Sequence, residues 1–165
     1  KGETAPNFGE QKILTVAAQD FLDNPVLHKE VFGPFSIVVQ CQDKAELVTV
    51  IQHLEGQLTG TILGTETEIK TSPEVVSALV NRVGRIIFNG VPTGVEVCPS
   101  MMHGGPFPST TDSRFTSVGT SAIRRWVRPV SFQSWPEEIL PDALKNNNPL
   151  DIMRLVNGEH SKQKI

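Results

Sequence analysis

The sequence predicts an α/β fold in which an open parallel sheet carries helices on both faces. Short apolar segments with strand character, at 35–41, 59–63 and 85–89, alternate with two stretches of helical periodicity. This alternation requires crossover connections, and crossovers give parallel strands. Continuous apolar runs are typical of strands covered on both faces. A β-branched run at 13–17 is a further candidate strand.

Each predicted helix has its own start and stop signals. Asp43 followed by Glu46 forms a D-x-x-E capping pattern, and Gly56 is the expected stop. The second helix begins at a capping serine, Ser72, with proline at the first helical position and an acid in the first turn. It ends at Gly84. The apolar side chains between these signals recur at helical spacing and supply the buried faces.

After the third strand the alternation stops. Residues 90–120 are rich in Gly, Pro, Ser and Thr and predict a loop, and loops of this length are usually functional or disordered. Extended character returns over Trp126–Trp135, where Pro129 favours an edge strand because proline cannot donate to a ladder. In the tail, Asn148–Pro149 could begin a helix and Asn157–Gly158 could form a hairpin turn, and the sequence leaves both open.

Composition and charge exclude several classes of function. The chain has 165 residues, of which 38% are hydrophobic and 20% charged, as in a soluble globular domain. A formal net charge of -3 gives no basic footprint for nucleic acid, and no apolar run approaches the roughly 20 residues of a membrane helix. With two cysteines, Cys41 and Cys98, and no visible signal peptide, we expect a cytoplasmic protein. The four histidines lack metal-ligand spacing, so no metal site is implied.

Two contiguous strings stand out in the chain. The first is HKEVFGP at His28–Pro34. The second runs on from Gly84 and includes GGPFPSTT at 104–111. In this order and spacing they resemble the C-terminal part of a member of the aldehyde dehydrogenase superfamily. This second string is similar to the branch that oxidises 2,5-dioxopentanoate (α-ketoglutaric semialdehyde), in which G-G-P-[FY]-P-[AS]-[ST]-[ST] is characteristic. The resemblance spans roughly residues 13–160.

The resemblance implies a domain organisation and a reaction. Residues 1–122 would be the C-terminal part of the catalytic domain, 123–136 an oligomerisation strand and 137–165 a C-terminal tail. The parent enzyme would oxidise an aldehyde, 2,5-dioxopentanoate first, to the carboxylate with NADP or NAD. In the family, a cysteine in a G-Q-x-C segment and a glutamate carry the catalysis, and both would lie upstream. We therefore expect no catalytic residue in this chain and no activity from it alone.

Within the chain, the resemblance implies cofactor and tunnel roles. Glu30 would accept hydrogen bonds from the nicotinamide ribose hydroxyls, for which a carboxylate is well suited, and Phe32 would pack beside the nicotinamide. Considered alone, a loop acid and a core phenylalanine are the commoner explanation. The loop after Asn89 would line the aldehyde tunnel, with Val97, Cys98, Met101, His103 and Phe107 in its wall.

Other features of the loop have weaker functional interpretations. His103, Thr110 and Arg114 are candidates for binding a substrate carboxylate, although such residues often only satisfy the backbone of turns. Gly104–Gly105 follows no apolar strand directly and opens no capped helix, so a phosphate cradle is a weak hypothesis. Cys98 has no base at a defined geometry, and we expect a tunnel-wall residue rather than a nucleophile.

Trp126–Trp135 also predicts an interface. Two tryptophans, Val130 and Phe132 stand in an otherwise polar stretch, and exposed apolar groups mark interfaces. The resemblance implies a homo-oligomer formed through this strand, with a small aldehyde as substrate and no nucleic-acid or membrane partner. Two alternatives stay open. One is a fatty aldehyde dehydrogenase of the same branch, and the other is a non-catalytic dimerisation module.

Overall fold

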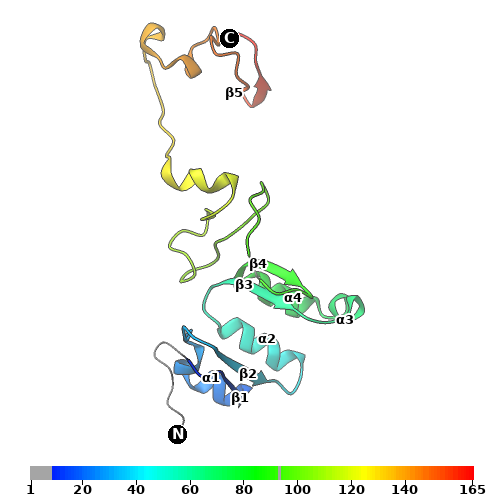
Figure 1. The fold of residues 1–165 in the computed structure, drawn as a ribbon. Helices are drawn as coiled ribbons and strands as arrows, with labels where there is room; N and C mark the ends of the chain where they lie inside the picture. The colour runs from blue at the N-terminus through cyan, green and yellow to red at the C-terminus, as the bar shows by residue number, and fades with distance from the viewer. Residues whose placement is uncertain (1–8, 93) are drawn as a thin grey trace. The chain divides into compact units, whose positions relative to one another are not determined.

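The computed structural model describes residues 9–92 and 94–165 (Figure 1). The chain divides into two compact units, Lys1–Val127 and Arg128–Ile165. The division falls inside the segment 123–136 that the sequence analysis treated as one strand. Among the described residues, no helix has both the length and the apolar character needed to cross a membrane.

The first unit is a mixed α/β arrangement in which strands and helices alternate. Both predicted helices and the four strands predicted in this unit form, but the second helix ends at Val80, and its predicted stop, Gly84, lies inside a strand. Helix α1, helix α3 and the 3-10 helices (η) were not predicted. The Thr65–Glu68 capping box was an available signal for α3. In chain order the elements are β1 (Lys12–Ala17), α1 (Ala18–Asp23), η1 (Pro25–His28), β2 (Phe35–Gln40), α2 (Lys44–His53), β3 (Gln57–Ile62), α3 (Glu66–Lys70), α4 (Pro73–Val80), β4 (Val83–Phe88) and η2 (Thr120–Trp126).

The strands form two separate parallel pairs, so the prediction of one open sheet is wrong. β1 pairs with β2 from Lys12↔Phe35 to Ala17↔Gln40, and β3 pairs with β4 from Gln57↔Val83 to Ile62↔Phe88. The parallel direction is confirmed. Helix α2 follows β2 and precedes β3, so it connects the two strand pairs along the chain. It packs against both α1 and α4 (Figure 1), and β2 and β3 do not pair with each other.

A small apolar core joins the first strand pair to the helices. Ala18, Phe21 and Val50 are buried, with Val39, Cys41 and Leu54 packed against them. Burial raises the pKa of the Cys41 thiol, and the nearby carboxylates of Glu46 and Asp43 raise it further. This thiol therefore stays protonated and packs as a small apolar group.

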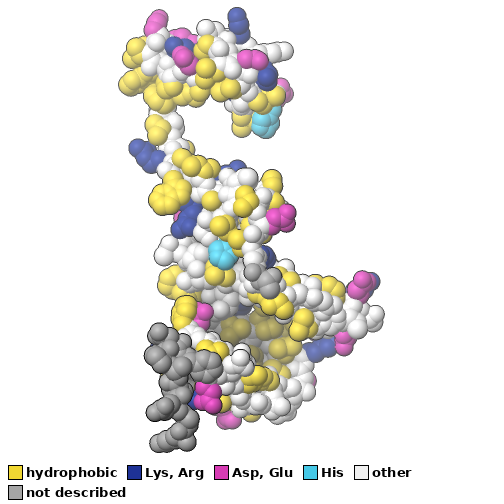
Figure 2. Space-filling model, viewed as in Figure 1, with side chains coloured by type: hydrophobic (Ala, Val, Ile, Leu, Met, Phe, Trp, Pro, Cys, Tyr) yellow, Lys and Arg dark blue, Asp and Glu magenta, His cyan; other side chains and the backbone are white. Residues whose placement is uncertain are grey.

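Several strand side chains of the first unit are exposed. Ile13 is 73% exposed, and Val38 and Phe88 are each 46% exposed. Hydrophobic side chains are accordingly visible on the molecular surface (Figure 2). The prediction that helices cover both faces of the strands is therefore wrong for the described residues. Apolar faces of this kind are typical of surfaces that pack on further protein.

The second unit is built from short elements. Two 3-10 turns, η3 (Glu137–Ile139) and η4 (Asp142–Leu144), precede an antiparallel hairpin of β5 (Arg154–Val156) and β6 (Glu159–Ser161). Asn157 and Gly158 have φ angles of 52° and 92°, as a two-residue type I′ hairpin turn requires.

Two expectations about the C-terminal part of the chain are resolved by this structure. The hairpin at Asn157–Gly158 is confirmed, and no helix begins at Asn148–Pro149. The predicted strand over 123–136 is wrong for the described structure. Residues up to Trp126 belong to the 3-10 helix η2, and residues 127–136 belong to no strand or helix.

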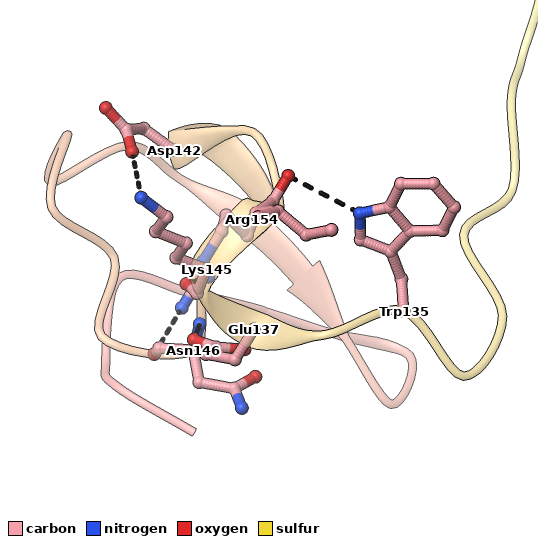
Figure 3. A network of polar contacts seen from close by, with 7 residues as sticks. Trp135, Glu137, Asp142, Lys145, Asn146 and Arg154 are labelled. Carbon is pink, nitrogen blue, oxygen red and sulfur yellow. Dashed lines mark hydrogen bonds and ion pairs between the residues drawn. The ribbon is translucent and has the colours of Figure 1, made fainter.

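Polar contacts hold the second unit together (Figure 3). The Arg154 guanidinium donates to the carbonyl oxygens of Lys145 at 2.6 Å and Asn146 at 3.4 Å. The backbone N–H of Asn146 donates to the Glu137 carboxylate at 2.7 Å, and the Lys145 ammonium pairs with the Asp142 carboxylate at 2.7 Å. Arg154 thus links the hairpin to the chain that precedes it.

Candidate functional site

Glu30 lies on a polar hollow of about 420 Å³ in the first unit. The side chain follows η1, whose start is fixed by Pro25 and by the Asn24 side chain, which accepts a hydrogen bond from the Val26 amide at 3.2 Å. The hollow joins the segment after η1 to the start of β3 and to the end of the GGPFPS string. Its lining residues are His28, Glu30, Glu55, Gly56, Gln57, Leu58, Thr59, Pro108 and Ser109.

The segment 104–109 reaches this hollow because it is tied to the start of β3. The Gly56 amide donates to the carbonyl oxygen of Phe107 at 3.3 Å. The hydroxyl and the amide of Ser109 both donate to the carbonyl oxygen of Pro106, at 2.6 and 2.9 Å. These bonds turn the chain so that Pro108 and Ser109 face the same space as Glu30.

The glycine pair of this segment serves close backbone packing. Gly104 and Gly105 are both buried. A β-carbon on Gly84 would overlap the Gly104 carbonyl, and one on Gly105 would lie 2.5 Å from the carbonyl oxygen of Gln57. The two glycines therefore lie against the starts of β3 and β4, where a side chain would not fit. This packing accounts for the glycines without a phosphate ligand.

Phe32 is exposed beside Glu30. Its side chain is 94% exposed, and Glu30 is also exposed. The alternative that Phe32 belongs to the core is therefore wrong for the described structure. An aromatic ring and a carboxylate two residues apart are both available to a ligand at this position.

The five residues expected in the tunnel wall are spread along the loop, and none of them lines the polar hollow. Val97 and Phe107 are 76% and 79% exposed, whereas Cys98, Met101 and His103 are half-buried. The Cys98 thiol lies 3.4 Å from the Ser100 hydroxyl. The structure thus places a thiol beside a hydroxyl, which is not a base that would activate it.

His103 is held by its backbone. Its amide donates to the Thr116 hydroxyl at 2.9 Å, and its carbonyl oxygen accepts from the amide and hydroxyl of Ser117, both at 2.9 Å. Thr116 itself is 3% exposed. The imidazole Nδ1 of His103 is buried and has no hydrogen-bond partner among the described residues.

The two other polar candidates of the loop are occupied by local contacts. The Thr110 hydroxyl donates to the carbonyl oxygen of Gly105 at 2.8 Å. The Arg114 guanidinium donates to both carboxylate oxygens of Asp112, at 2.9 and 2.7 Å. This bidentate pair lowers the pKa of Asp112 from 3.8 to about 2. Both side chains therefore satisfy turns, as the simpler explanation proposed.

The sequence analysis did not single out Arg85, and it did not predict that the Asn89 side chain bonds to another segment. Arg85, on β4, donates through Nη1 to the carbonyl oxygen of Gly94 at 3.2 Å and lies 3.8 Å from the Met101 sulfur. Its Nε is buried without a hydrogen-bond partner in the described part of the chain. The amide of Asn89 bridges to Gly64 through two hydrogen bonds of 2.9 and 2.8 Å. Both contacts depend on which loop the strand end meets, and no local motif encodes this.

No group of three or more metal-ligating side chains comes together within residues 9–92 and 94–165. The lining of the hollow offers the carboxylates of Glu30 and Glu55 and the imidazole of His28. A polar hollow lined by an exposed carboxylate, with the exposed ring of Phe32 two residues further along the chain, suits a hydroxyl-bearing ligand that also has a flat ring.

The comparison with known proteins agrees with the motifs. Over 135 residues, or 82% of this chain, the sequence is 53% identical to the alpha-ketoglutaric semialdehyde dehydrogenase of Acinetobacter baylyi. Over 147 residues, or 89% of this chain, it is 46% identical to alpha-ketoglutaric semialdehyde dehydrogenase 2 of Azospirillum brasilense. The chain is homologous to the alpha-ketoglutaric semialdehyde dehydrogenases. The resemblance predicted from HKEVFGP and GGPFPSTT is thereby confirmed.

The homology covers a part of each dehydrogenase. The matched regions make up 26% of the Acinetobacter protein and 28% of the Azospirillum protein, so the chain spans about a quarter of the length of these curated relatives. No protein-family model matches the chain. The homology to alpha-ketoglutaric semialdehyde dehydrogenases therefore applies to the 135 to 147 matched residues of this chain, and the activity of a whole enzyme is a matter of proposal.

Proposed function

We propose that this chain is the C-terminal part of an NAD(P)-dependent dehydrogenase that oxidises alpha-ketoglutaric semialdehyde to the carboxylate. The observation that carries the proposal is the homology to two dehydrogenases of that name, at 53% and 46% identity over most of the chain. The exposed Glu30 and Phe32 beside the polar hollow support it, because they offer the groups that a nicotinamide nucleoside needs.

The chain would contribute binding and orientation. The carboxylate of Glu30 would accept hydrogen bonds from the two ribose hydroxyls of the cofactor, and the ring of Phe32 would lie against its nicotinamide. When bound, the nicotinamide supplies the hydride acceptor for aldehyde oxidation. The segment 104–109, held in place by the Gly84–Gly104 contact, would form one wall of this site.

The substrate carboxylate would be recognised by the loop after β4. Arg85 of β4 supplies a cation beside this loop, where its Nη1 donates to the carbonyl oxygen of Gly94. A cation suits the free carboxylate of a dioxo acid, whereas the exposed Val97 and Phe107 would suit the apolar tail of a fatty aldehyde.

The nucleophile would come from outside this chain. No G-Q-x-C segment occurs in the 165 residues, and Cys98 lies beside Ser100 rather than a base. We therefore expect the isolated chain to show no turnover with NADP+ and short aldehydes. Turnover that disappears in Cys98→Ala would identify Cys98 as the nucleophile and overturn this part of the proposal.

The oligomer would form through the segment Trp126–Trp135. Trp126 is 82% exposed, and Phe132 and Trp135 are 41% and 50% exposed. Aromatic groups of this kind dominate the energetics of interfaces. If this segment instead served only to dimerise the chain, the Glu30 hollow would have no role, so the cofactor experiment below also tests the dimerisation-module alternative.

The test is Glu30→Gln in the intact dehydrogenase, with Glu74→Gln on α4 as the matched control. Glutamine keeps an acceptor but loses the charge, and a charge-assisted hydrogen bond exceeds a neutral one by about 1 kcal/mol. We expect roughly five-fold weaker binding of NAD+ or NADP+ in Glu30→Gln and unchanged binding in the control. Equal cofactor affinity in wild type and Glu30→Gln, measured by titration calorimetry, would contradict the proposed role.

A further inference from the structure

His28 is anchored to the apolar core of the first unit by two contacts with the same residue. Its ring stacks on the ring of Phe21, with centroids 4.3 Å apart and planes inclined by 22°. Its Nε2–H donates to the carbonyl oxygen of Phe21 at 2.7 Å. Phe21 is only 5% exposed and belongs to the buried cluster of α1. His28 is therefore fixed in position and orientation.

His28 also lines the polar hollow, two residues before Glu30. Residues 30–32 themselves make no hydrogen bond or ion pair with other described residues. The next attachment along the chain is at Pro34, whose carbonyl oxygen accepts from the Lys12 amide at 2.9 Å. On the other side, the Lys29 amide donates to the Val26 carbonyl oxygen at 3.4 Å and closes the 3-10 turn η1, and His28 is the residue of this turn whose side chain is fixed to Phe21 of the core. The position of the backbone at Glu30 is thus set from this side by the turn and by the contact of His28 with Phe21.

We propose that His28 is a positioning residue that acts on the cofactor through Glu30. This inference rests on the proposed function of Glu30 and adds the group that holds it. Fixing the chain before Glu30 reduces the number of positions the carboxylate can take before a ligand arrives. A preorganised carboxylate binds two vicinal hydroxyls at a smaller entropic cost than a mobile one.

The contacts of His28 can be removed separately. His28→Phe keeps the stacking on Phe21 and loses the hydrogen bond, His28→Gln keeps a donor and loses the ring, and His28→Ala loses both. The matched control is His53→Ala, because His53 makes an equally short bond of 2.7 Å to the carbonyl oxygen of Thr49 but does not line the hollow. All variants would be made in the intact dehydrogenase.

We expect His28→Ala to weaken the binding of NAD+ and NADP+ about five-fold, the effect of roughly 1 kcal/mol. His28→Phe and His28→Gln should each recover part of the affinity, and the KM for the aldehyde should stay within two-fold of wild type. Thermal melting of each variant shows whether the fold is intact. If His28→Ala melts too early to assay, His28→Phe tests the hydrogen bond alone, and cofactor affinity equal to wild type in His28→Phe would then overturn the proposal.

The decisive measurement is a double-mutant cycle with Glu30→Gln. His28→Ala is expected to lower the cofactor affinity about five-fold in the wild-type background. If His28 acts through Glu30, the same substitution should lower the affinity by less than two-fold in the Glu30→Gln background. Full additivity would overturn the proposal, as would an equal loss in His53→Ala. Unchanged cofactor affinity in Glu30→Gln alone would overturn the proposed function of Glu30 and this inference with it. A normal Glu30→Gln effect with no His28→Ala effect would overturn only the role of His28.

Discussion

Gly84 of β4 and Gly104 of the long loop pack backbone against backbone, with no room for a β-carbon on Gly84. The contact holds the loop against the start of the second strand pair. From there the chain turns through Pro106 and Phe107 to reach the hollow that Glu30 also lines. This glycine contact, together with the hydrogen bond from Gly56 to Phe107, brings Pro108 and Ser109 to the wall of the candidate site.

Gly84→Ala is expected to destabilise the first unit by about 2 kcal/mol, since the added methyl group must displace backbone rather than a flexible side chain. Gly94→Ala is the control, because a β-carbon at Gly94 meets nothing within 4 Å. Denaturant unfolding of the two variants measures the difference. Equal stability of Gly84→Ala and Gly94→Ala would show that the loop is not held at this point.

Asn89→Ala is expected to cost about 2 kcal/mol, because it removes both hydrogen bonds to Gly64. Asn89 also has a φ of 48°, which alanine adopts poorly. Asn89→Gly separates the two effects, since glycine accepts this backbone angle but lacks the amide. We expect the glycine variant to recover less than half of the loss in thermal unfolding. Full recovery would mean that backbone strain, not the amide bridge, makes asparagine important here.

Arg114→Gln is expected to return the pKa of Asp112 from about 2 toward its ordinary 3.8, because it removes the bidentate partner. A carboxylate whose pKa is lowered by folding contributes stability that is complete above the ordinary pKa and is lost as the pH falls through the folded value. Wild type and variant should therefore differ in stability above about pH 4 and converge near pH 2. The chemical shift of the Asp112 carboxyl carbon follows the titration. Since the pair is exposed, its effect should fall in high salt.

Phe132→Asp is expected to shift the intact protein toward smaller species, since a buried aromatic at an interface commonly contributes about 2 kcal/mol or more. The rings of Phe132 and Trp135 meet edge to face, with their centroids 5.6 Å apart. Phe132 is 41% exposed, so part of its side chain is accessible to a partner. Leu155→Asp, on β5 of the same unit and 65% exposed, is the control. Sedimentation velocity reports the mass. A folded Phe132→Asp protein with the parental mass would contradict the interface role.

The sequence by itself determined the local elements and the family. Helix α2 begins where Asp43 accepts a hydrogen bond from the Glu46 amide at 2.9 Å, because a capping pattern is a local interaction between residues three apart. The turn at Asn157–Gly158 likewise depends on two adjacent residues. By contrast, Ser72 precedes α4 as predicted, but its side chain makes no capping hydrogen bond to the helix. The sequence therefore predicted the start of this helix but not the contact expected there. Family identity was available because the HKEVFGP and GGPFPSTT strings are contiguous.

Only the tertiary structure decided how these elements meet. Periodicity cannot say which strand lies beside which, so the single predicted sheet became two parallel pairs connected by α2. Glu30, Gln57 and Ser109 are far apart in sequence. They meet in one hollow where the segment 104–109 packs on the starts of β3 and β4, through the Gly56–Phe107 hydrogen bond and the Gly84–Gly104 contact. The anchoring of His28 on Phe21 has the same origin. Local sequence specifies backbone conformation residue by residue, whereas contacts between distant segments are selected by packing, which depends on the whole chain at once.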